Sequence, residues 1–175
     1  MVLRNWRFIT LTLTALSMAT AFSHALELLP KMRYDAALYL TLFKSLYEFY
    51  GKIAGFCEIG AVLAAVVLVF MVPRPRPAFV PTLIGAICMV AAHAAFWIWV
   101  NPANNLMASW QVQSPPADWM RVRDQWEYAH LARFFLQLIA LAALQLSVLR
   151  DPPLAAESAE NPAEPRLART RVRAA

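Results

Sequence analysis

Four long apolar runs divide the sequence, and each is long enough to cross a lipid bilayer. They cover residues 8–29, 53–72, 78–100 and 128–149. A helix that spans the hydrocarbon layer needs about 20 mainly apolar residues, and each run meets that length. The pattern therefore predicts an all-α fold, a transmembrane four-helix bundle that forms one integral membrane domain over residues 1–150.

The segment 31–52, between the first two runs, has a different pattern. Lys44 and Glu48 fall on one side of a helix, and Leu46 and Phe49 fall on the other. Four of the five tyrosines lie in this segment, which is typical of a helix at the headgroup layer. We therefore predict an extra amphipathic interfacial helix, with its tyrosines as membrane anchors. The alternative is that the segment continues straight into the second span.

The first 29 residues have some features of a secretory signal peptide, namely Arg4, Arg7 and a following apolar core. A signal core has no need of a polar face, whereas a helix inside a bundle does. Polar and small residues here recur at helical spacing, so we expect the segment to be retained as the first span. This stripe consists of Thr10, Thr14, Ser17, Ala21, His24 and Glu27.

Composition supports a membrane protein and argues against a nucleic-acid partner. The chain is 60% hydrophobic and 15% charged, which is more apolar than an ordinary soluble domain. Its net charge of +5 comes from Arg and Lys that flank the apolar runs, where they contact lipid headgroups and determine topology. The expected partner is therefore the lipid bilayer. The tail 151–175 is rich in Pro, Ala and Glu without periodicity, and we expect it to be a disordered cytoplasmic tail.

Most ionisable residues of the predicted spans belong to one membrane face. Antiparallel connections place the end of the first span, the start of the second, the end of the third and the start of the fourth on the same side. At 1.5 Å per residue, the ionisable groups then lie within about 10 Å of one boundary, and the opposite halves of the predicted spans have none. A charge inside a span costs about 2.5–3.5 kcal/mol, so paired groups in one polar pocket are expected. The six residues are His24, Glu27, Glu58, His93, His130 and Arg133.

Within this pocket, His24 and Glu27 are expected to face Glu58 and Arg133, which leaves His93 and His130 to act. The simpler interpretation is that each group is an end-residue whose side chain reaches water. That interpretation suits Glu127 and in part His130, but His93 and Glu58 are too deep and too short. Near Glu58, the glycines at 51, 55 and 60 are expected to permit close helix approach.

Three motifs carry a resemblance to a known family. They are Arg121-x-Arg123-x2-Trp126-x3-His130-x2-Arg133, Asn-Pro-x-Asn at 101–104, and His24-x2-Glu27-x2-Pro30. In this order they resemble a family of small four-span membrane proteins of unknown function whose named members are anthrone oxygenases. The resemblance covers residues 15–149 and implies oxidation of an anthrone-type aromatic polyketide to a quinone by oxygen, without a cofactor.

The resemblance also implies roles for particular residues. A base in a dry pocket would deprotonate an acidic carbon, and His93 or His130 suits this role because the pKa of histidine lies near working pH. Arg133 would hold the enolate oxygen. A flat aromatic substrate would be covered by a set of mostly aromatic side chains. This set is Phe96, Trp97, Trp126 and Asn105.

Two other classes of function compete with this one. His24, His93, His130 and Glu58 would together suit a metal ion, which would make the chain a metal-binding membrane oxidoreductase. No HxxxH spacing accompanies them, and no Gly-rich nucleotide loop occurs. The third class is a non-enzymatic membrane subunit, or a protein that binds a small ligand.

The flanking charges predict the topology. Arg4, Arg7, the basic turn 73–77 and Arg150 share one side of the membrane, which favours cytoplasmic termini, facing inward from the inner membrane if the source is a bacterium. Reporter fusions at Arg150 and Gln113 should therefore report opposite sides. A cytoplasmic Gln113 would contradict the orientation, and two reporters on one side would contradict the number of spans.

Overall fold

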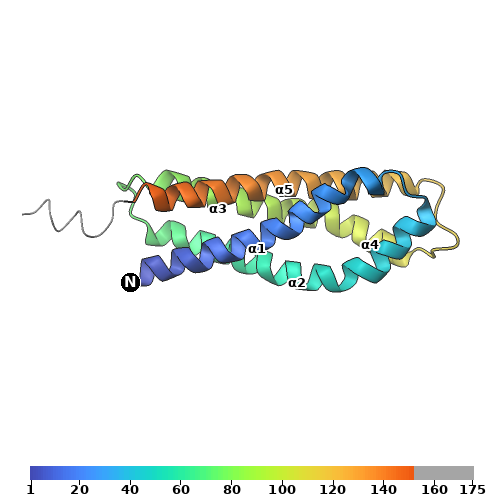
Figure 1. Ribbon diagram of the computed structural model, residues 1–175, viewed down its shortest axis with the longest axis horizontal. Helices are drawn as coiled ribbons and strands as arrows, with labels where there is room; N and C mark the ends of the chain where they lie inside the picture. Colours follow the sequence, from blue (N-terminus) through green and yellow to red (C-terminus); the bar gives the residue numbers. More distant parts are fainter. Residues whose placement is uncertain (152–175) are drawn as a thin grey trace, which may run out of the picture.

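Four long antiparallel helices form one elongated bundle (Figure 1). The computed structural model describes residues 1–151 except the side chain of Glu48, so the predicted tail lies outside it from residue 152 onward. All elements in the described part are helical: α1 (Val2–Lys31), α2 (Ala36–Met71), α3 (Phe79–Ala95), the π-helical turn η1 (Phe96–Val100), α4 (Asn101–Ser109) and α5 (Trp119–Leu149).

The predicted all-α transmembrane bundle is confirmed. Four helical stretches are long and apolar enough to cross a membrane, namely Val2–Lys31, Phe49–Met71, Phe79–Ser109 and Trp119–Leu149. The side chains that face outward are large and apolar. Phe56 and Phe70, for example, are 81% and 84% exposed, as expected of a surface that contacts lipid tails.

The amphipathic segment between the first two runs is part of α2, which is a single helix of 36 residues. Of the two alternatives, the structure therefore has the one in which this segment continues into the second span. The helix begins where the Asp35 carboxylate accepts the Leu38 N–H at 2.8 Å, a side-chain N-cap.

The third span is longer than expected. The predicted run ends at residue 100, but the chain turns once as η1 and continues as α4 to Ser109. Pro102 lies in the first turn of α4, where its missing N–H breaks no hydrogen bond. The carbonyl of Trp99 in this π turn accepts the side-chain N–H of Gln125 of α5 at 2.9 Å.

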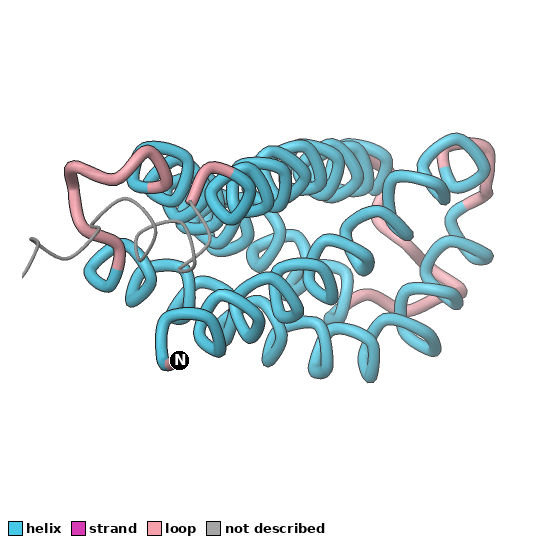
Figure 2. The backbone as a smooth tube through the Cα atoms, turned by 60° about the vertical axis from the view of Figure 1, so that its left-hand side comes forward, coloured by secondary structure: helices cyan, strands magenta, loops and turns pink. Residues whose placement is uncertain are grey.

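The antiparallel arrangement places the start of α1 and the end of α5 at the same end of the bundle (Figure 1). α1 packs against α2 and α5, and α3 packs against α2 and α5. Within residues 1–151, the loops lie at the two ends of the bundle (Figure 2). At the end with the N-terminus, the Arg7 guanidinium lies 2.6 Å from the Asp151 carboxylate. The expectation that this half of the spans has no ionisable group is wrong, because α1 begins at Val2 and Arg7 is buried within it.

The polar stripe of the first span faces the interior, as predicted. Thr10, Thr14, Ser17, Ala21 and His24 are all buried. Of these polar groups, the Ser17 hydroxyl lies 3.2 Å from the side-chain oxygen of Gln137 on α5. The stripe ends on buried Lys31, whereas the predicted end, Glu27, is partly exposed.

The glycines differ in what surrounds them. A Cβ added to Gly85 would lie 2.7 Å from Leu144 Cγ and 3.2 Å from the Ala140 carbonyl oxygen, so α3 and α5 are in close contact there. A Cβ on Gly60 would lie 3.3 Å from a methyl group of Leu13. Nothing lies within 4 Å of such an atom at Gly51 or Gly55. The predicted close helix approach is therefore wrong for those two glycines.

This difference gives a stability test. Gly85→Ala should destabilise the bundle by about 1–3 kcal/mol, because the added methyl group overlaps Leu144 and a backbone carbonyl. Gly51→Ala, the matched control, should be neutral or stabilising by up to about 1 kcal/mol, since alanine is the better helix former. Thermal unfolding of the purified variants in detergent measures both. A Gly85→Ala protein at least as stable as the control would contradict the close α3–α5 contact.

Candidate functional site

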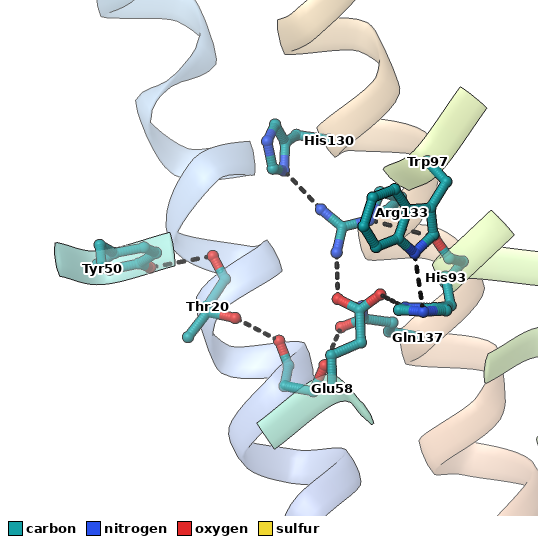
Figure 3. A network of polar contacts seen from close by, with 10 residues as sticks. Thr20, Tyr50, Glu58, His93, Trp97, His130, Arg133 and Gln137 are labelled. Atoms are coloured by element: carbon teal, nitrogen blue, oxygen red, sulfur yellow. Dashed lines mark hydrogen bonds and ion pairs between the residues drawn. The ribbon is translucent and has the colours of Figure 1, made fainter. Parts of the chain in front are cut away.

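An ion pair between Glu58 of α2 and Arg133 of α5 lies at the centre of the site (Figure 3). The two side chains are in direct contact, and the residues are only 5% and 6% exposed. The Arg133 Nε–H also donates to the Ala92 carbonyl of α3 at 3.2 Å. One guanidinium therefore joins three helices, which satisfies the donors of a charge buried at membrane depth.

The same ion pair determines the tautomers of two histidines. Arg133 donates through Nη1 to His130 Nδ1 at 3.0 Å, and Trp97 donates its indole N–H to His93 Nε2 at 3.0 Å. Guanidinium and indole are donors only, so these ring nitrogens accept. His130 therefore carries its proton on Nε2. His93 carries its proton on Nδ1, which lies 3.1 Å from the Glu58 carboxylate.

A second buried cluster surrounds Lys31, the last residue of α1. The Lys31 ammonium group lies 2.8 Å from a Glu27 oxygen and 3.6 Å from a Glu127 oxygen. It also lies 3.4 Å from His24 Nδ1 and 5.0 Å from the centre of a Trp126 ring. Because an ammonium group is only a donor, His24 Nδ1 accepts and the His24 proton is on Nε2.

Two tyrosines from the first half of α2 complete the Lys31 cluster. Tyr39 donates its hydroxyl to Glu127 at 2.9 Å, and Tyr47 donates to Glu27. Burial, reinforced by the neighbouring carboxylates, raises the pKa of both phenols well above the ordinary value, so they stay neutral donors. The predicted anchor role is wrong for Tyr39, which is 3% exposed. The predicted reach of Glu127 to water is also wrong, because the residue is 1% exposed.

The two clusters meet at a pair of stacked imidazoles. The rings of His24 and His130 lie 4.1 Å apart, and the edge of Trp126 contacts both. Trp126 is held in turn by its indole N–H, which donates to the Asn104 side-chain oxygen at 2.6 Å. Positions from all three of the sequence motifs therefore meet here, on α1, α4 and α5.

A cavity of about 630 Å³ opens beside the stacked histidines. Among the described residues, neither Nε2 of the pair has a hydrogen-bond partner. Aromatic rings form much of the cavity wall, which is typical of a site for a small ring compound. Its lining residues are His24, Phe43, Lys44, Tyr47, Tyr50, Gly51, Lys52, Phe96, Val100, Asn104, Asn105, Ala108, Trp126 and His130.

A narrower space of about 110 Å³ leads from this cavity to the Glu58–Arg133 pair. The shared walls are His24, Tyr50, Gly51, Phe96 and His130. Five of the six predicted site residues line the narrower space: His24, Glu58, His93, His130 and Arg133. Of the predicted substrate-binding set, Phe96, Trp126 and Asn105 line the large cavity, and Phe96 and Trp97 line the narrow one.

Glu27 is the predicted residue that lines neither space. It pairs with Lys31, Tyr47 and Ser23 instead. The expectation that Glu27 faces Glu58 and Arg133 is therefore wrong, because a lysine already supplies the positive charge that Glu27 requires.

Sequence reasoning missed Lys31 as a member of the site. The signal is present, since Lys31 follows His24 by seven residues and Glu27 by four, on the buried stripe of α1. Pro30 conceals it, because proline is normally taken as the end of a helix. In the structure α1 continues through Pro30 to Lys31.

The predicted metal ligands do not form a ligand group. Within residues 1–151, no group of three or more His, Cys, Asp or Glu side chains could hold a metal ion. The Arg133 guanidinium contacts both Glu58 and His130, so a positive charge already occupies the position between these two candidates.

Comparisons with known proteins found no relative of this chain. The chain matches no protein-family model, and neither the curated proteins nor the solved structures contain a match.

The buried ion pair gives a second stability test. Arg133→Ala should destabilise the bundle by about 3–5 kcal/mol and lower the folded yield, because Glu58 would remain buried without its cation. Arg121→Ala is the matched control, since its pair with Asp118 at 3.1 Å is 70% and 61% exposed and should contribute less than about 1 kcal/mol. Folded yield from membranes and thermal unfolding in detergent measure both. Equal stability of the two variants would refute the central role of Arg133.

Proposed function

We propose that this chain is an integral membrane enzyme that oxidises a planar aromatic carbonyl compound of the anthrone type with molecular oxygen. The observation that supports this most directly is the stacked pair His24 and His130. Each has a fixed Nε2–H without a partner among the described residues, beside an aromatic-walled cavity of about 630 Å³. In the orientation that we propose, both termini are cytoplasmic and this cavity lies near the opposite face of the membrane.

The histidine pair suits the recognition of a carbonyl oxygen. Neutral imidazole N–H groups donate to such an oxygen and bind it more strongly as it gains charge. An anthrone gains this charge when its CH2 group loses a proton, because the electrons move to the carbonyl oxygen of the same ring. Aromatic side chains such as Phe96 and Trp126 would cover the rings.

His93 is the better of the two expected bases. Glu58 accepts its Nδ1–H at 3.1 Å, so Nε2 is the basic nitrogen. Trp97 donates to this nitrogen at 3.0 Å, and the exposed indole would turn away when substrate binds. His130 is less suitable because its free nitrogen already carries a proton. Arg133 would act as a positioning residue, since its donors already bind Glu58, the Ala92 carbonyl and His130.

The reaction needs one oxygen molecule for each substrate molecule. The CH2 carbon loses two hydrogen atoms and gains one oxygen atom as a carbonyl group. The second oxygen atom leaves with the two hydrogen atoms as water. The substrate is oxidised by four electrons and O2 is the oxidant, so no cofactor takes part in this balance.

A second candidate is a membrane protein that binds such a compound without converting it. One observation favours it, since the acceptor nitrogen of each histidine already has a donor: Lys31, Trp97 or Arg133. Turnover distinguishes a binding protein from an enzyme.

The test uses purified full-length protein in detergent, with anthrone as substrate and oxygen uptake as the readout. Wild type should consume one O2 for each quinone formed. His93→Ala should lower the rate by a factor of about 10²–10⁴, the usual contribution of a general base. His130→Ala should also lower it, while Arg121→Ala should leave it unchanged because that side chain is 70% exposed in its surface pair. A wild type that binds anthrone without oxygen uptake would refute the enzyme and support the binding protein.

A further inference from the structure

Gly51 and Gly55 of α2 stand in open space, which is unusual for glycine inside a helix. Nothing lies within 4 Å of where a Cβ would be at either position. Glycine in a helix interior is about 1 kcal/mol less favourable than alanine. Close contact with another helix would explain this choice, and at Gly85 it does, but no such contact exists here.

Both glycines belong to the cavity wall. Gly51 lines the large cavity and the narrow one, and Gly55 lines the narrow one. One helical turn separates them, so they form a continuous strip without side chains. Any side chain on this strip would narrow the opening beside the histidine pair.

This strip lies in the part of α2 that crosses the membrane. It belongs to the span Phe49–Met71, and Ile59, one helical turn after Gly55, also lines the narrow space and is 47% exposed. Trp97 of η1, which also lines the narrow space, is 56% exposed. Exposed apolar side chains at this depth contact lipid tails, so the strip is open toward the hydrocarbon layer.

We propose that Gly51 and Gly55 form a lateral opening through which a planar, uncharged aromatic compound enters the cavity from the bilayer. The inference rests on the proposed function in one respect, that the cavity binds such a ring compound. It adds the source of the substrate, which partitions into lipid before it binds.

The large cavity also has a polar rim at the end of the bundle. Lys44 donates to the Ala108 carbonyl at 2.8 Å and so connects α2 to α4 there, beside Asn104 and Asn105. A water-soluble ligand would reach the cavity by this rim. The two routes can therefore be blocked separately.

The experiment compares two probes on full-length protein in phosphatidylcholine nanodiscs. Anthraquinone partitions into the lipid, and anthraquinone-2-sulfonate stays in water. Stopped-flow tryptophan quenching gives association rates, and only the part of the signal abolished by saturating sulfonate is counted. Gly55→Leu should slow anthraquinone association at least tenfold and leave the sulfonate rate unchanged. Ala94→Leu is the matched control, because it adds the same side chain at an exposed position of α3 that lines neither space.

Each outcome is decisive. A Gly55→Leu protein that binds both probes at wild-type rates overturns the lateral opening, and so does equal slowing of both, which would mean that leucine fills the binding site. Slowing by Ala94→Leu to the same extent overturns it too, since bulk anywhere on the lipid face would then suffice. A wild type that binds only the sulfonate refutes the opening and retains the cavity. A wild type that binds neither probe refutes the proposed function itself.

Discussion

The structure depends on one requirement, that the polar atoms of a carboxylate and a guanidinium buried at membrane depth all find partners. Glu58 and Arg133 meet this requirement through contacts that reach α2, α3 and α5. An unpaired charge in the same place would be costly, because neither water nor lipid could solvate it. The pair therefore fixes how these helices are rotated. The side chains that bond to this pair, including His93 and His130, are thereby held in defined orientations.

In the Lys31 cluster, buried charged groups are likewise paired with each other. Lys31 and Arg133 each donate to one Nδ1 atom of the stacked histidines, Lys31 to His24 and Arg133 to His130. Because neither cation can accept a proton in this role, both rings keep Nε2–H. The donors beside the cavity are thus oriented before any ligand binds. Such preorganisation is what makes hydrogen-bond donors effective toward a developing negative charge.

The sequence predicts which face of a single helix is buried. It does not predict which residues of other helices that face will contact. The buried stripe from Thr10 to His24 follows from helical periodicity alone, and it is buried as predicted. The partners across the bundle do not follow from periodicity. Glu27 binds Lys31 because α1 continues past Pro30, and Tyr39 is buried where the first turns of α2 pack against the first turns of α5. Helix ends and relative rotations are tertiary properties, and the pairing of charges depends on both.

The two sides of the cavity are built differently. On the α1 and α5 side, charged groups hold the rings of His24 and His130 in place, so this wall cannot collapse without breaking buried ion pairs. On the α2 side, Gly51 and Gly55 leave one stretch of the wall without side chains. A wall held by charged groups opposite a stretch of bare backbone favours a ligand with the same asymmetry. Such a ligand carries acceptor oxygen at one edge and bare aromatic surface at the other, which describes a ring ketone better than a sugar, a nucleotide or a fatty acid.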